Sequence, residues 1–186
     1  MSNLKKVILI QTDITTFAVQ AIVNSANKSL LGGSGLDYVI HKKAGPLMKT
    51  ECIQLHQEKG GCSTGQAEVT TAGNLPAQYL IHAVGPRWLD VERNEPQLLC
   101  DAYSNAIMKA NHVGVKTISF PNISTGVYGF PRQLAAEIAI GTILSTLPQY
   151  DCVEEVFFVC RDDENYLIYK AILSNINDPK IKIQIE

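Results

Sequence analysis

Residues 117–131 read TISFPNISTGVYGFP, an apolar run that leads directly into a loop of unusual composition. The first four residues, 117–120, have the β-branched and aromatic content that is typical of a strand. Two prolines bracket the loop, which contains two glycines together with Ser124, Thr125 and Tyr128. A plain connecting turn does not need this combination of hydroxyl groups and conformationally free residues. The stretch therefore predicts a strand that ends at a functional loop.

Strands and helical segments alternate along the rest of the chain. Apolar residues at helical spacing predict helices around residues 98–110 and 134–147. Alternating strands and helices predict a layered α/β domain, in which ligands bind beyond the carboxyl ends of the strands. Short apolar and β-branched runs predict the strands, at residues 7–10, 21–23, 67–71, 79–83, 117–120 and 156–160.

The length and the end of the chain bound its domain organisation. With 186 residues, 46% of them hydrophobic, the chain has the size and composition of one globular domain. Residues 177–179, Asn-Asp-Pro, end the last helical segment, and residues 180–186 alternate isoleucine with polar residues. We therefore expect one domain over residues 1–186, with residues 177–186 as a short tail or edge strand.

Charge and cysteine usage exclude several classes of function. Sixteen basic and 18 acidic residues give a net charge of -2, so there is no bulk attraction to nucleic acid or to an anionic membrane. The five cysteines are scattered without a C-x-x-C pair, which argues against a disulfide framework and a structural zinc site. The apolar run at residues 7–10 is too short for a signal peptide. We expect a cytoplasmic protein that recognises any phosphate locally.

Two further loops share the composition of the first. Residues 23–27 read VNSAN and residues 31–37 read LGGSGLD. Consecutive amides in glycine-rich turns and at helix starts form anion sites, so two such loops facing each other could hold a diphosphate. Tight turning without a ligand is the alternative for any single loop. Residues 60–66 imitate a Walker A motif but place Gln66 where lysine is needed, which disfavours a magnesium triphosphate enzyme.

Six motifs together resemble the macrodomain family, and within it the MacroD-type group and the bacterial O-acetyl-ADP-ribose deacetylase-like proteins. The resemblance extends from Val7 to about Leu173. It implies a three-layer α/β/α sandwich with a mixed central sheet, which binds ADP-ribose in a cleft across the top of the sheet. The motifs are DIT at 13–15, IVNSAN at 22–27, GGSGLD at 32–37, IHKKAG at 40–45, IHAVGP at 81–86 and FPNISTGVYG at 120–129.

The resemblance also assigns ligand-binding roles. Asp13 would accept a hydrogen bond from the adenine amino group, although an aspartate there also caps the next segment. Arg161 occupies a position where related proteins often carry an aromatic residue, and its guanidinium plane can stack on adenine. Asn24 would contact ribose, and Tyr128 would close over the distal ribose. The remaining ligand-binding residues expected along the cleft are Ile14, Gly33, Ser34, Gly35, Ser124, Thr125, Gly126 and Val127.

Asn27 and Asp37 carry the expected chemistry. In the MacroD-type proteins the matching asparagine and aspartate face the distal ribose, so the resemblance implies hydrolysis of an ester on that ribose. The ester joins it either to acetyl, as in O-acetyl-ADP-ribose, or to a protein carboxylate. Asp37 would orient or deprotonate a water, or act with a substrate phosphate that does so, while Asn27 fixes the ribose hydroxyls. Alternatively, Asp37 only stabilises the first turn of a helix.

No cofactor or metal is expected, because the histidines show no ligand spacing and the cysteines do not cluster. His41 and His82 are interpreted as packing residues. Two other classes of function stay open. One is a binding module that recognises ADP-ribose or ADP-ribosylated protein without hydrolysing it. The other is a regulatory protein that contacts RNA or an RNA-processing enzyme, which the acidic charge balance disfavours.

Overall fold

A computed structural model describes residues 4–89 and 94–186. The strands are β1 Lys5–Gln11, β2 Ala21–Ala26, β3 Ala67–Thr71, β4 Tyr79–Val84, β5 Thr117–Phe120, β6 Glu155–Cys160 and β7 Ile181–Ile185. The helices are α1 Gly35–Ala44, α2 Pro46–Lys59, α3 Glu95–His112, α4 Arg132–Thr146 and α5 Asp163–Leu173, with a 3-10 turn at Leu147–Gln149. Each predicted strand is present.

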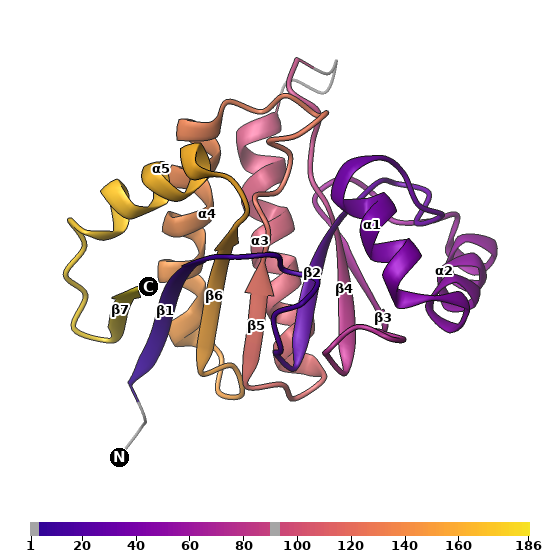
Figure 1. Cartoon of the computed structure of the whole chain (residues 1–186), viewed down its shortest axis with the longest axis horizontal. Coiled ribbons are helices and arrows are strands. Elements are labelled where there is room, and N and C mark those ends of the chain that lie inside the picture. The colour runs from indigo at the N-terminus through magenta and orange to yellow at the C-terminus, as the bar shows by residue number, and fades with distance from the viewer. Residues whose placement is uncertain (1–3, 90–93) are drawn as a thin grey trace.

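The strands form one mixed sheet in the order β3-β4-β2-β5-β6-β1-β7. β3 pairs antiparallel with β4, and the other neighbouring strands pair in parallel. The parallel strands therefore bring their carboxyl ends to one edge, the upper edge of the sheet in Figure 1. The alternating isoleucines near the end of the chain form β7, which lies at the edge of the sheet beside β1.

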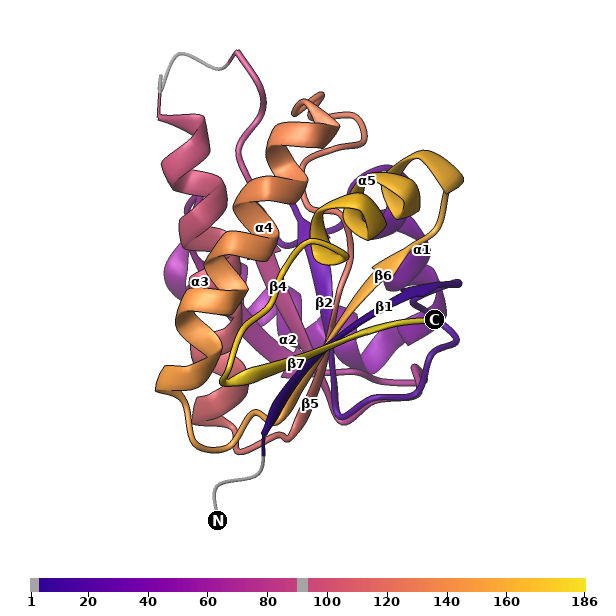
Figure 2. The same cartoon turned by 90° about the vertical axis from the view of Figure 1, so that its left-hand side faces the viewer.

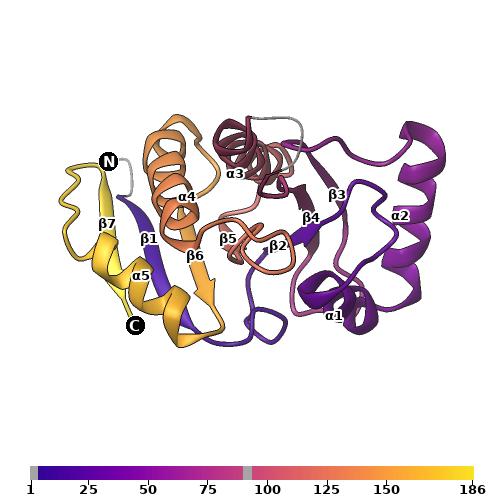
Figure 3. The same cartoon turned by 90° about the horizontal axis from the view of Figure 1, so that it is seen from above.

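Helices cover both faces of this sheet. Val7 and Leu9 point to a core shared with α3, α4 and α5, whereas Ile22 and Leu80 point to a second core shared with α1 and α2. Figures 2 and 3 show α3 and α4 on the opposite side of the sheet from α1. This arrangement confirms the predicted three-layer sandwich with a mixed sheet.

Two features differ from the elements predicted from sequence. Helix α2 has no predicted counterpart, because it buries only Met48 and Cys52 and so lacks a clear apolar periodicity. Strand β2 continues through Ala26, whereas residues 23–27 were expected to form a loop. The pairing of Asn24 with His82 and of Ala26 with Val84 extends β2 along β4. Among the described residues, no helix combines the length and the apolar character that crossing a membrane requires.

Candidate active site at the carboxyl ends of the strands

A cavity of about 560 Å³ lies beyond the carboxyl ends of the central strands. The loops after β1, β2, β5 and β6 supply its walls, as expected for an open α/β sheet. Every site residue predicted from the sequence lines it, except Asn24. The lining residues that sequence reasoning did not identify as part of the site include Arg87, Arg132, Asp162 and Asn165. These residues belong to none of the recognised motifs, and only the folded structure shows that they lie at the cleft.

The side chains of Asn27 and Asp37 converge on Gly33. A Cβ atom added to Gly33 would lie 3.1 Å from Asn27 Nδ2 and 3.0 Å from Asp37 Oδ2. Asn27 is held in place because its Nδ2 donates to Gly32 O at 2.8 Å and its Oδ1 accepts from Ser29 Oγ at 2.8 Å. The glycine loop therefore brings the two predicted catalytic side chains to one end of the cavity.

Asp37 has one engaged oxygen and one available oxygen. Its Oδ1 accepts a hydrogen bond from Asn24 Nδ2 at 2.8 Å and lies 3.4 Å from His41 Nε2. Its Oδ2 is buried and has no hydrogen-bond partner in the described part of the chain. A buried carboxylate oxygen without a donor is costly unless a ligand or water supplies one. Asp37 is therefore oriented through Oδ1, and its Oδ2 can accept a hydrogen bond from a ligand or a water.

Asn24 does not occupy the predicted ligand-contacting position. Its side chain is fully buried within β2, beneath Asp37, and does not line the cavity. Its amide nitrogen donates to Asp37 Oδ1 and lies 3.1 Å from His82 Nδ1. In place of the expected ribose contact, Asn24 makes a positioning contact to Asp37, because β2 continues along β4 for three residue pairs beyond Val23.

The loop at residues 122–131 presents backbone donors to the cavity. Ser124 has a positive φ of 67°, and its carbonyl accepts from Phe130 N at 2.9 Å, which folds the loop back on itself. Within the described chain, the amides of Gly126, Val127 and Tyr128 donate to no other group. Opposite them, Ser34 precedes α1 without a side-chain cap, so the first-turn amides of α1 also stay open. Both features suit a bound anion.

Asp13 lies at the other end of the cavity. Its Oδ1 accepts from Thr15 Oγ1 at 2.6 Å and Thr15 N at 2.9 Å, so the capping interaction considered from the sequence is present. Its Oδ2 lies 3.3 Å from Arg161 Nη1 and 3.5 Å from Lys43 Nζ. The hydrogen bonds from Thr15, followed by these two cations, lower the pKa of Asp13. Asp13 is therefore an anionic acceptor beside an exposed guanidinium group.

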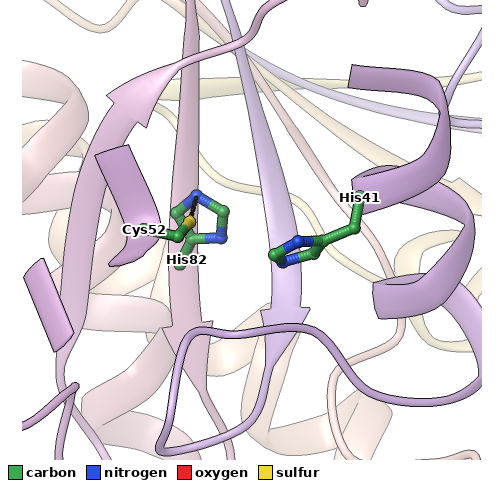
Figure 4. A group of neighbouring side chains, drawn as sticks. All are labelled: His41, Cys52 and His82. Carbon is green, nitrogen blue, oxygen red and sulfur yellow. Dashed lines mark hydrogen bonds between the residues drawn. The ribbon is translucent and has the colours of Figure 1, made fainter. Parts of the chain in front are cut away.

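Three buried side chains that are far apart in sequence meet behind Asp37. His41 on α1, Cys52 on α2 and His82 on β4 place their ligand-type atoms within 4.8 Å of one another (Figure 4). The sequence did not predict this grouping, because the three residues show no metal-ligand spacing along the chain. The expectation that His41 and His82 are packing residues agrees with their burial.

The chemistry of this cluster fits a hydrogen-bonded support better than a metal centre. Both ring nitrogens of His82 are engaged, Nδ1 by Asn24 Nδ2 and Nε2 by Thr70 Oγ1 at 2.9 Å. Burial, followed by the nearby His41, lowers the pKa of His82 to about 4, so the ring is neutral at pH 7. Burial also raises the pKa of the Cys52 thiol to about 12, so the sulfur is a neutral thiol in this cluster. The chain Thr70, His82, Asn24 therefore orients Asp37.

Gly33→Ala should lower kcat/KM for ester hydrolysis about tenfold. The added methyl group must push Asp37 Oδ2 and Asn27 Nδ2 aside, since both lie about 3 Å from its position. Gly33 does not have a positive φ, so the backbone should tolerate alanine. Steady-state kinetics and urea unfolding would measure the two effects. Gly141→Ala on α4, where a Cβ meets nothing within 4 Å, is the matched control. Unchanged kinetics in Gly33→Ala would contradict this convergence.

The protein should lose stability as the pH falls from 7 to 5, partly through His82. In this range the unfolded histidine, with a pKa near 6.5, takes up a proton that the folded one, with a pKa of about 4, does not. The folded state therefore loses about 2 kcal/mol relative to the unfolded state. His82→Gln should remove this part of the pH dependence in urea unfolding, and His112→Gln, at an exposed position, should not. Equal pH dependences of wild type and His82→Gln would contradict the prediction.

Comparisons with known proteins agree with this architecture. A family model described as the Macro domain matches residues 23–139. A Macro domain-containing protein of Acinetobacter sp. is 81% identical over 98% of this chain and 100% of its own length. An O-acetyl-ADP-ribose deacetylase of Escherichia fergusonii is 49% identical over 91% of this chain and 96% of its own length.

The fold is also similar to solved structures. The Oceanobacillus iheyensis macrodomain with ADP superposes with a TM-score of 0.84 and 38% identity, covering 89% of this chain and 88% of that one. The residues that the family model matches include the loops after β2, β4 and β5, which line the cavity. The chain belongs to the macro domain family.

Proposed function

We propose that this protein is a hydrolase that binds ADP-ribose, removes the acetyl group from O-acetyl-ADP-ribose and cleaves ADP-ribose from protein carboxylates. The deacetylase name of the relative from Escherichia fergusonii supports the first reaction, and the ADP in the similar Oceanobacillus iheyensis structure supports a nucleotide in the cleft. Release from protein carboxylates follows from the same ester chemistry. Cytoplasmic location stays a prediction from the scattered, unpaired cysteines.

The lining of the cavity suggests how ADP-ribose lies in it. Adenine would lie at Asp13, whose carboxylate accepts from the exocyclic amino group, with Arg161 stacked on the ring. The diphosphate would lie between the amides of residues 126–128 and the first turn of α1. These main-chain donors can bind a dianion without a lysine in either loop. The distal ribose would then lie under Tyr128, next to Asn27 and Asp37.

The reaction consists of the attack of water on the ester carbonyl carbon. Asp37 Oδ2 accepts a hydrogen bond from the water and takes its proton as the new carbon–oxygen bond forms. The carbon–oxygen bond to the ribose then breaks, and the ribose oxygen receives the proton that Asp37 took from the water. The acid loses its proton to solvent and leaves as a carboxylate. Asn27 holds the ribose hydroxyls, and Asn24 engages Asp37 Oδ1, which leaves Oδ2 for the water.

One observation carries this proposal. The buried Asp37 Oδ2 has no partner among the described residues, and it meets the fixed amide of Asn27 at Gly33, at one end of a cavity with open backbone donors. A packing role for Asp37 requires only Oδ1. A buried carboxylate oxygen without a partner in the protein is suited to accept a hydrogen bond from substrate or water.

Acetate release from O-acetyl-ADP-ribose by the purified protein tests the proposal. We expect turnover that a metal chelator does not change, together with binding of ADP-ribose in calorimetric titration. Tight binding of ADP-ribose without acetate release would instead identify a non-catalytic reader of ADP-ribosylated protein. Absence of both binding and turnover would reject hydrolase and reader alike, and RNA affinity with a steep salt dependence would then favour the regulatory alternative.

A further inference from the structure

A second cavity of about 360 Å³ adjoins the end of the cleft where the reaction is proposed to occur. It shares Asn27, Arg87 and Tyr128 with the first cavity. Ser29, Thr64 and Gly85 contribute to its other walls. Since Asn27 also meets Asp37 at Gly33, the junction of the two cavities lies next to the proposed ester. A group attached to the distal ribose through that ester can extend into the second cavity.

The second cavity is much larger than an acetyl group requires. One water molecule occupies about 30 Å³ of the liquid, and an acetyl group has only three heavy atoms. A space of about 360 Å³ therefore admits an acyl chain several atoms longer than acetyl. Its walls combine the hydroxyl groups of Ser29 and Thr64 with the cationic residues Lys28 and Arg87, so a purely aliphatic chain would meet polar groups there.

Arg87 is held at the junction by its neighbours. Its guanidinium carbon lies 5.1 Å from the centre of the Tyr128 ring, in a cation–π arrangement. The next residue, Trp88, donates its amide to Tyr128 O at 2.8 Å and packs edge-on against Phe130, with ring centres 4.8 Å apart. These contacts attach the segment that contains Arg87 and Trp88 to the loop at residues 122–131. None of the described residues that line the second cavity is acidic.

We propose that the second cavity binds the acyl part of the substrate, and that Arg87 selects acyl groups that carry a second carboxylate. The inference rests on the proposed ester hydrolysis and specifies its substrate class. The chemistry of the step is unchanged: water adds to the ester carbonyl, the bond to the ribose oxygen breaks, and the acid leaves as a dicarboxylate. The guanidinium offers paired donors to the distal carboxylate before and after cleavage. A small dicarboxylic acid and an acidic polypeptide share this feature.

Two matched pairs of substrates test the proposal through kcat/KM, each corrected for hydrolysis without protein. The first pair is O-succinyl-ADP-ribose and O-butyryl-ADP-ribose, which have acyl chains of equal carbon number and differ in the terminal carboxylate. The second pair is ADP-ribose esterified to glutamate in an acidic or in a neutral peptide. We expect the charged member to be preferred about fivefold, the effect of one partly exposed ion pair. Preference in the first pair indicates a small acid, and preference in the second indicates a polypeptide.

Variants locate the effect at Arg87. Arg87→Gln should reduce the preference to about one, whereas Arg87→Lys should retain most of it because the charge stays. Arg132→Gln is the matched control, because Arg132 lines the first cavity but not the second, and the preference should not change. Thr64→Phe should lower the ratio of butyryl to acetyl hydrolysis by filling the second cavity.

The outcomes separate this inference from the proposed function. Hydrolysis of the acetyl ester with no charge preference in either pair, or a preference that survives in Arg87→Gln, overturns the inference and leaves the hydrolase intact. Failure to hydrolyse every ester overturns both. A charge preference that Arg87→Gln removes and Arg132→Gln retains supports the assignment.

Discussion

Asp37→Asn should reduce kcat for hydrolysis of O-acetyl-ADP-ribose by about 10²- to 10⁴-fold, the usual contribution of a general base. The substitution keeps the shape of the side chain and an oxygen that can accept from Asn24 Nδ2. It removes the negative charge and the proton acceptor at Oδ2. Affinity for ADP-ribose should change only a few-fold, because the proposed diphosphate site consists of backbone amides. Single-turnover acetate release and calorimetric titration measure the two quantities separately.

A charge-matched control is available for this variant. Asp151 lies in the exposed loop before β6, away from the cavity, and Asp151→Asn should leave both hydrolysis and binding unchanged. Hydrolysis by Asp37→Asn within tenfold of wild type would remove Asp37 as the base. A joint loss of binding and turnover would show that Asp37 acts mainly in holding the glycine loop.

Gly85→Ala should have the largest effect on ligand affinity among single methyl additions. The new Cβ would lie 2.1 Å from Ser124 Oγ and 2.6 Å from Ile123 Cγ2, distances that require the loop to move. Overpacking of this kind destabilises a protein by about 1–3 kcal/mol. Because Ser124 lies two residues before the amides of 126–128 that are proposed to bind the diphosphate, affinity for ADP-ribose should fall at least about tenfold.

Urea unfolding and calorimetry with ADP-ribose measure both effects of Gly85→Ala. Gly141→Ala is the matched control, because this helical position is exposed and free of contacts, and alanine there should be neutral or stabilise the protein by up to about 1 kcal/mol. If Gly85→Ala bound ADP-ribose as tightly as wild type, the position of the loop at residues 122–131 could not control affinity. That result would argue against the backbone-amide site.

Much of the fold could be predicted because local patterns and tertiary structure agree along most of this chain. The stretch at residues 117–131 forms β5 and the loop over the cavity, as its composition indicates. The glycine loop before Asp37 leads into α1, and the side chains of Asn27 and Asp37 converge on Gly33. Helix α2 was missed because it buries few residues, so its sequence has little apolar periodicity to detect.

The parts of the site that could not be predicted depend on neighbours in space. The extension of β2 through Asn24 follows from pairing with β4, and nothing in the residues of β2 alone indicates it. The grouping of His41, Cys52 and His82 joins α1, α2 and β4, so no spacing in the sequence reveals it. Arg87 directly follows the motif at residues 81–86, yet its place at the junction of two cavities depends on its contact with Tyr128.

The most direct test of the account is a crystal structure of the protein with ADP-ribose bound. We expect the diphosphate oxygens to accept hydrogen bonds from the amides of residues 126–128 and from the first turn of α1. The distal ribose should lie within hydrogen-bonding distance of Asn27 and Asp37 Oδ2. An empty cleft, or a ligand bound in reverse with adenine beside Asp37, would contradict the central claim that backbone donors present the distal ribose to this carboxylate.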